Sequence, residues 1–321
     1  MAVPTVTVTS QPRTRPNWGR RLLITVVALA VLAGVVVAGL SIYVAGNLSA
    51  AYRVPVDTAA ATTSGTNYSD VSFPSRQQVT LKGWLFHAAN NAAARSVIMV
   101  HGWHHNRIDT SYHTDQVAHD LLQHGYDVLL FDLSACGESG GDHFTLATKE
   151  YLDVLGAYDF MKSGAAGTAY DPHQMAVIGD SMGAASTLRA SVEMPDVGAI
   201  VADSSFAELR PILEKELPAR SPLPAFFTQP TLWAVPLYGL DPNLRPVDAV
   251  RAQPQRAFLF FHGLADDFVP PGNADELRAA SPNPDSALVL VPGAKHVRTY
   301  EADPAAYMAR VYQFFDKEMG Q

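Results

Sequence analysis

"VIGDSMGAAS" (residues 177–186) places a serine between two glycines, directly after a short apolar run. The pattern G-x-S-x-G over residues 179–183 is expected at a tight turn from a strand into a helix, where glycine lets the two backbones approach each other. Such a turn holds the Ser181 hydroxyl clear of the sheet, beside the free N–H groups of the helix N-terminus. The motif is short, and a capping turn that contains a serine gives the same letters, so it needs support from the rest of the chain.

The rest of the chain alternates apolar runs with helix-length segments of mixed polarity. The runs are apolar along most of their length, as strands are when helices cover both faces of a parallel sheet. This alternation predicts an α/β fold with a doubly wound, mostly parallel sheet and a ligand site at the carboxyl ends of the strands. The expected strands are residues 79–86, 96–102, 126–132, 175–180, 198–205, 256–263 and 286–293. The expected helices are residues 112–124, 145–163, 182–194, 271–280 and 304–319.

A serine hydroxyl becomes a working nucleophile only when a base accepts its proton, and a base needs an orienting acid. Two adjacent acids, Asp266 and Asp267, follow the strand expected at residues 256–263. His296 stands just past the last expected strand. The three groups stand in the chain order serine, acid, histidine, and each follows its own expected strand. We therefore predict that Ser181, Asp266 and His296 form a catalytic triad.

Four segments resemble the signature segments of the α/β-hydrolase superfamily of serine hydrolases. They are HGW (101–103), GDSMG (179–183), HGLADDFVP (262–270) and GAKH (293–296), within a match that runs from about residue 79 to 315. The segments are most similar to the bacterial group related to prolyl-oligopeptidase and dienelactone-hydrolase domains. The resemblance implies an α/β-hydrolase fold and acyl transfer without a metal or organic cofactor.

Within this resemblance, Asp266 rather than Asp267 matches the position of the triad acid, although adjacent carboxylates can exchange roles. Acyl transfer also needs N–H donors for the developing oxyanion. One expected donor is the backbone N–H of Met182, the residue after the nucleophile, and the resemblance implies that the other is the N–H of Trp103.

One loop departs from the pattern of the superfamily. Related enzymes often carry D-x-R-G-x-G-x-S after the strand expected at residues 126–132, and here Ser134 replaces the arginine. Any bracing role of that arginine is therefore in doubt. Cys136 lies in the same loop, where a small packing residue is the simpler interpretation than a reactive thiol.

The N-terminal region has a different composition. Residues 22–46 contain no charged residue, and at 1.5 Å per residue they span roughly 37 Å as a helix, enough to cross a bilayer. Four arginines precede this segment, so the positive-inside rule predicts a cytoplasmic segment at residues 1–21 and an extracellular remainder. A cleaved signal peptide and a buried core helix are the alternatives. Residues 47–78 are small and polar and are interpreted as a linker, with the hydrolase domain at residues 79–321.

The charge of the remaining chain restricts its partners. After residue 53 the chain holds 18 basic and 31 acidic residues, which argues against binding to nucleic acid. The expected partners are a small ester or short peptide as substrate, and the lipid bilayer through the N-terminal helix.

Residues 206–250 are longer than a connection between a strand and a helix requires. The segment contains eight prolines, which prevent one long helix, and its aromatic residues suggest short apolar pieces over the strand ends. We interpret the segment as a small lid with Phe226, Phe227 and Trp233 as substrate-binding residues. Packing at the sheet edge and contact with a membrane are alternative roles.

Several other polar residues have plainer interpretations. Five histidines between residues 101 and 119 lack the spacing and the acid of a metal site, and His101 is expected to order the oxyanion loop. Asp203 is either an alternative triad acid or, more simply, a helix cap. Glu150 and Asp153 are expected on a solvated helix face.

The sequence therefore predicts a serine hydrolase of the cell membrane that cleaves carboxylic esters through an acyl-enzyme. A peptidase or amidase of the same fold is one alternative. A membrane-tethered binding protein without turnover is another, because a fold alone does not decide function.

Overall fold

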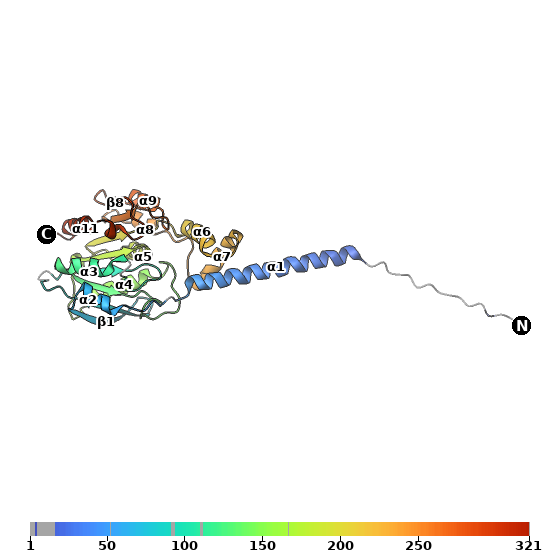
Figure 1. Cartoon of the computed structure of the whole chain (residues 1–321), viewed down its shortest axis with the longest axis horizontal. Helices are drawn as coiled ribbons and strands as arrows, with labels where there is room; N and C mark the ends of the chain where they lie inside the picture. Colours follow the sequence, from blue (N-terminus) through green and yellow to red (C-terminus); the bar gives the residue numbers. More distant parts are fainter. Residues whose placement is uncertain are drawn as a thin grey trace.

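In the computed structural model of the 321-residue chain, residues 4, 17–51, 53–90, 94–109, 112–165 and 167–320 are described. Within these residues one sheet has the strand order β1-β2-β4-β3-β5-β6-β7-β8 (Figure 1). Strand β2 is antiparallel to β1 and β4, and the remaining neighbours pair in parallel. The strands are β1 Tyr68–Pro74, β2 Thr80–Phe86, β3 Ser96–Val100, β4 Asp127–Phe131, β5 Met175–Asp180, β6 Ala199–Asp203, β7 Leu259–Gly263 and β8 Ala287–Val291.

Helices cover both faces of the sheet, so the predicted doubly wound, mostly parallel α/β architecture is confirmed. The α-helices are α1 Trp18–Ser49, α2 Thr58–Ser64, α3 Thr114–Gln123, α4 Tyr151–Ser163, α5 Met182–Ala190, α6 Leu209–Arg220, α7 Thr228–Ala234, α8 Pro246–Arg251, α9 Gly272–Ala280, α10 Thr299–Ala302 and α11 Pro304–Met319. Short 3-10 turns are η2 Pro172–Gln174, η3 Ser191–Glu193, η4 Ala225–Phe227 and η5 Val235–Tyr238.

Alternation along the central strands divides the buried side chains into two cores. Leu129 and Val177 contribute to the core under α4, α5, α8 and α9. Their neighbours Val128 and Ala176 contribute to the core under α2, α3 and α11. Because successive side chains of a strand point to opposite faces, a strand buried on both sides reads as a continuous apolar run.

The structure corrects the interpretation of residues 47–78 as a linker. Residues Tyr68–Pro74 form strand β1, which pairs with β2 at the edge of the sheet, and Asp57 caps helix α2 through hydrogen bonds from the backbone N–H groups of Ala59 and Ala60. Edge strand β1 is mostly exposed, with Phe73 as its buried side chain. Its composition is therefore polar, which is why the sequence did not reveal it as a strand.

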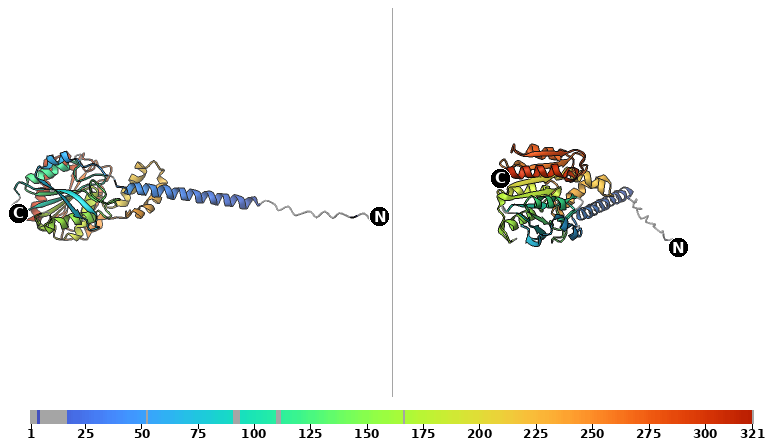
Figure 2. Two further views of the ribbon diagram at one scale, coloured as in Figure 1. Left: turned by 90° about the horizontal axis from the view of Figure 1, so that it is seen from below. Right: turned by 60° about the vertical axis from the view of Figure 1, so that its left-hand side comes forward.

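The segment predicted as a lid is shorter than residues 206–250. Helices α6 and α7 with η4 and η5 stand beyond the carboxyl ends of the strands, whereas α8 packs into the core through Val247 and Val250 (Figures 1 and 2). We use "lid" below for α6 to η5, residues 209–238.

Helix α1 begins and ends a few residues outside the predicted segment 22–46. It has 32 residues and a mean hydropathy of 2.8 over its most apolar window, none of which is buried in the structure. It projects from the domain beside α6 and α7 (Figure 2). Length and composition alone suit a membrane anchor and a signal sequence equally.

We predict that Gly183→Ala destabilises the protein. An added Cβ would lie 2.2 Å from the carbonyl oxygen of Val100, so backbone would have to move. The expected loss is about 1–3 kcal/mol of unfolding free energy, measured by thermal unfolding in detergent. Gly272→Ala is the control, because nothing lies within 4 Å of its added Cβ. Equal melting temperatures for the two variants would contradict the prediction.

Candidate active site

Ser181 lies on the turn between β5 and α5. Its backbone has a conformation that residues other than glycine rarely adopt. Its φ is 51° and its ψ is −118°. The turn is so tight that a Cβ at Gly179 would lie only 2.6 Å from the carbonyl oxygen of Gly183. The structure thus confirms the strand–turn–helix context expected of G-x-S-x-G. Close packing on both sides holds the serine in this strained geometry.

The structure brings Ser181, His296 and Asp266 together from three separate loops. The Oγ of Ser181 lies 2.8 Å from Nε2 of His296. On the other side of the ring, Nδ1 lies 2.7 Å from Oδ2 of Asp266. Asp267 is exposed, so of the two adjacent acids Asp266 is the one that contacts the imidazole.

The Asp266 carboxylate is buried and heavily hydrogen-bonded. Its Oδ1 accepts hydrogen bonds from the backbone N–H groups of Phe268 and Val269, at 3.0 and 2.9 Å. His262 lies 3.2 Å from Oδ2. Burial raises the pKa of Asp266, but the bonds from His262 and His296 outweigh it and lower the pKa to about 2. The acid is therefore ionised at neutral pH and can orient the imidazole.

The loop after β3 brings two backbone N–H groups to the same place. A Cβ at Gly102 would lie 3.2 Å from the Cβ of Ser181, so glycine allows this loop to approach the serine closely. Trp103 follows in the loop, and Met182 begins α5. Among the residues that the structure describes, neither the Trp103 N–H nor the Met182 N–H has a hydrogen-bond acceptor. Both residues line the cavity that contains Ser181.

His101 connects this loop to its neighbour in the way the sequence suggested. Its Nε2 accepts a hydrogen bond from the N–H of Leu133 at 3.0 Å, and its Nδ1 donates to the carbonyl oxygen of Gly102. Burial lowers the pKa of His101 to about 4, so the ring stays neutral and can both accept and donate. The His101 ring thereby joins the loop after β3 to the loop after β4.

Sequence analysis missed Arg107, the basic residue that braces the loop after β4. Its guanidinium Nη2 lies 2.6 Å from Oδ2 of Asp132, and both side chains are almost fully buried. Ser134, which stands where related enzymes often carry arginine, donates a hydrogen bond from its hydroxyl to the carboxylate of Asp153. Arg107 lies 25 positions before its partner, so only the fold brings the two together.

Three acids differ from their expected roles. Glu150 and Asp153 are buried rather than solvated. Glu150 accepts from the hydroxyl of Thr145 at 2.9 Å, and burial raises the pKa of Asp153 to about 7. Asp203 does not cap the following helix, whose N-cap is Glu208, and its carboxylate instead accepts from the hydroxyls of Ser204 and Thr299.

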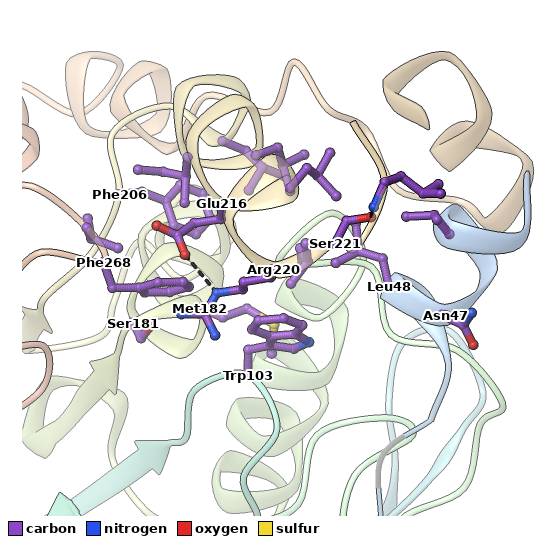
Figure 3. A pocket seen from close by; sticks show the side chains of 18 of the residues that line it. Asn47, Leu48, Trp103, Ser181, Met182, Phe206, Glu216, Arg220, Ser221 and Phe268 are labelled. Carbon is purple, nitrogen blue, oxygen red and sulfur yellow. Dashed lines mark hydrogen bonds and ion pairs between the residues drawn. The ribbon is translucent and has the colours of Figure 1, made fainter. Parts of the chain in front are cut away.

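A cavity of about 490 Å³ opens in front of Ser181 (Figure 3). Apolar side chains of α6 and of the flanking loops form most of its wall, and five residues of α1 line its far end. Phe226, Phe227 and Trp233 do not line it, which corrects their prediction as substrate-binding residues. Phe226 and Trp233 are instead 64% and 74% exposed, on the outer surface of the lid.

Two further sequence observations have structural outcomes. No group of three or more His, Cys, Asp or Glu side chains within the described ranges could hold a metal ion. Cys136 is buried, and burial raises the pKa of its thiol, which agrees with a packing role.

The chain belongs to the α/β hydrolase family, whose profile matches residues 97–313. The resemblance read from the sequence is thus confirmed at the level of the superfamily. No curated protein matches the chain.

Solved structures of similar proteins include esterases. An esterase of Pyrococcus furiosus is 26% identical with a TM-score of 0.69, over 84% of this chain and 98% of that chain. The α/β hydrolase GrgF from Penicillium is 20% identical with a TM-score of 0.65, over 80% and 100% of the two chains. A Butyrivibrio proteoclasticus protein with bound ferulic acid is 17% identical with a TM-score of 0.58, over 78% and 100%. The family match and the similarity to solved esterase structures together support a hydrolase.

We predict that Arg107→Met lowers the unfolding free energy by about 3–5 kcal/mol, because it leaves the buried carboxylate of Asp132 without its cation. Urea unfolding measures the change. Arg251→Met is the matched control, since Arg251 pairs with Asp248 at the surface, with side chains 56% and 52% exposed. Its expected loss is about 0–1 kcal/mol. A similar loss in both variants would refute the bracing role of Arg107.

A second prediction concerns pH. The pKa of Asp266 is lowered from 3.8 to about 2, so the ionised carboxylate stabilises the folded state above about pH 4, and this stabilisation disappears as the pH falls toward 2. The difference in unfolding free energy between the wild type and Asp266→Asn should therefore narrow over this interval. Denaturant titrations at pH 2.5 to 7 measure it. A difference that stays constant with pH would show that the charge of Asp266 is not what stabilises the loop.

Proposed function

We propose that this protein is a serine hydrolase that cleaves carboxylic esters through an acyl-enzyme. The observation that carries the proposal is the chain of hydrogen bonds from Ser181 through His296 to Asp266. Beside it lie two N–H groups that have no acceptor within the described residues. An imidazole 2.8 Å from a serine oxygen is within the range for proton transfer.

In the proposed mechanism, Nε2 of His296 takes the proton of Ser181 as the serine oxygen attacks the ester carbonyl carbon. Asp266 accepts the hydrogen bond from Nδ1 and stabilises the imidazolium that forms. The N–H groups of Trp103 and Met182 stabilise the oxyanion of the tetrahedral intermediate. His296 then protonates the leaving alcohol and afterwards activates water, which releases the acid and regenerates Ser181.

The cavity supports esters over peptides as substrates. Its wall is mostly apolar, and the Glu216 and Arg220 side chains that line it pair with each other at 2.7 Å, so their charges are already matched. A peptide substrate would bury amide N–H and carbonyl groups against this wall without partners, which is unfavourable. The similarity to the Pyrococcus furiosus esterase supports the same choice.

We further propose that α1 is retained as a single-pass membrane anchor. Ser41, Ala45 and Ser49, on its last turns, are buried against the domain, so removal of the helix would expose that surface. Four arginines precede the apolar segment, which favours an N-terminus in the cytoplasm and a catalytic domain outside the cell.

The test is activity with p-nitrophenyl esters of increasing chain length and with aminoacyl anilides, together with labelling by a fluorophosphonate. We expect the wild type to cleave the esters and to be labelled. Ser181→Ala should abolish labelling and lower kcat by about 10⁶-fold, and Asp266→Asn should lower kcat by about 10⁴-fold.

Asp267→Asn is the matched control, because Asp267 is exposed and adjacent to the proposed acid. Its kcat should stay within about twofold of the wild type. Hydrolysis of the anilides alone would replace the esterase by a peptidase. The absence of both labelling and turnover in the folded protein would favour a binding protein.

A further inference from the structure

The structure points to a lipid substrate: we propose that the enzyme hydrolyses a long-chain ester drawn directly from the bilayer that holds α1. The outer turns of α1 would form part of the site for the alkyl chain. This inference rests on the proposed ester hydrolysis at Ser181 and specifies its substrate class and route of entry.

One face of α1 lines the cavity in front of Ser181. The five α1 residues in its wall are Leu40, Tyr43, Val44, Asn47 and Leu48. Their spacing of three and four positions places them on a single helical face. Figure 3 shows Asn47 and Leu48 at one end of the cavity and Ser181 at the other. Leu40 and Tyr43 are 37% and 68% exposed, so the cavity reaches the surface beside α1.

This end of α1 is packed against the lid rather than loosely tethered. The hydroxyl of Tyr238, in η5, donates a hydrogen bond of 3.3 Å to the carbonyl oxygen of Ile42. A Cβ at Gly46 would lie 2.8 Å from the same hydroxyl, so glycine permits the close contact. The wall that α1 contributes to the cavity therefore has a defined position.

The length of α1 places that wall at the membrane surface. The first 19 residues of the uncharged segment, from Leu22 to Leu40, measure roughly 28 Å as a helix, close to the thickness of a bilayer core. When this stretch spans the core, Tyr43 and the cavity opening lie at the boundary between the hydrocarbon and the head groups. Tyrosine is enriched at that depth in membrane proteins.

The lid exposes apolar side chains beside the same end of α1. Phe226, Trp233 and Leu237 are 64%, 74% and 70% exposed, and they lie on η4, α7 and η5. Helix α7 and η5 pack against α1. Large apolar side chains on a segment next to a membrane helix are suited to insert into the interface. The membrane-contact role that the sequence left open for this segment therefore agrees with its position.

The wall of the cavity suits an alkyl chain. Besides α1, it is formed largely by apolar side chains, among them Ile212, Leu213 and Leu217 of α6. A chain that moves from the bilayer into this cavity stays in apolar surroundings, whereas a chain that arrives through water must first leave the membrane. The structure therefore favours lateral entry of a membrane ester over capture of a dissolved one.

The test uses the full chain reconstituted in phosphatidylcholine vesicles, with 4-methylumbelliferyl palmitate as the membrane ester and the butyrate as the soluble ester. The palmitate is placed either in the same vesicles as the enzyme or in separate ones. We expect palmitate hydrolysis at least about tenfold faster in the same vesicles, because the cavity opens to the membrane of its own anchor.

Two pairs of variants test the role of α1. Val44→Trp fills the α1 end of the cavity, and Val36→Trp, a position 51% exposed on the apolar stretch, is its control. Gly46→Leu separates α1 from Tyr238, and Gly39→Leu, with nothing within 4 Å, is its control. Val44→Trp and Gly46→Leu should lower the ratio of palmitate to butyrate hydrolysis by about tenfold, while the controls leave this ratio unchanged.

The outcomes separate the two proposals. Lateral entry would be overturned by equal rates of palmitate hydrolysis in the two vesicle arrangements, or by no effect of Val44→Trp and Gly46→Leu. If butyrate is still hydrolysed in that case, the proposed esterase activity is retained. Failure to cleave either ester or to react with a fluorophosphonate would overturn the esterase itself.

Discussion

The close approach of backbones around Ser181 is the constraint on which the rest of the structure depends. Strand β5 turns into α5 within so little space that side chains are excluded at Gly179 and Gly183, and the serine between them takes a positive φ. This strain is sustained because the turn is packed between β3 and β6 in the centre of the sheet. The same packing projects the hydroxyl toward the loops after β7 and β8, which carry Asp266 and His296.

Buried carboxylates hold the loops around the site, and each one is stabilised by a different means. Asp266 keeps its charge through bonds from histidines and backbone N–H groups. Asp132 forms a buried ion pair with Arg107. Asp153 has a raised pKa because burial outweighs the hydrogen bonds that it accepts. Because an unpaired buried charge is so unfavourable, the position of each acid is coupled to the loop that supplies its partners.

The lid and α1 connect this rigid centre to the N-terminal helix. Helix α6 forms the apolar wall of the cavity, and α7 with η5 carries the contact to α1. The aromatic residues Phe226 and Trp233 of the lid are exposed outside the cavity, whereas Phe206, just before the lid, lines it. The cavity thus lies between Ser181 and a hydrophobic helix.

The sequence alone determined the central strands, the turn at Ser181 and the order of the three polar groups, because buried parallel strands are continuously apolar and the motifs are local. Tertiary structure decided what depends on distant partners. Composition could not reveal edge strand β1, whose side chains are mostly exposed, or the pairing of Arg107 with Asp132. It also could not show which lid side chains face the cavity or that α1 lines it. Those contacts depend on how separate elements pack against each other, which local sequence patterns do not predict.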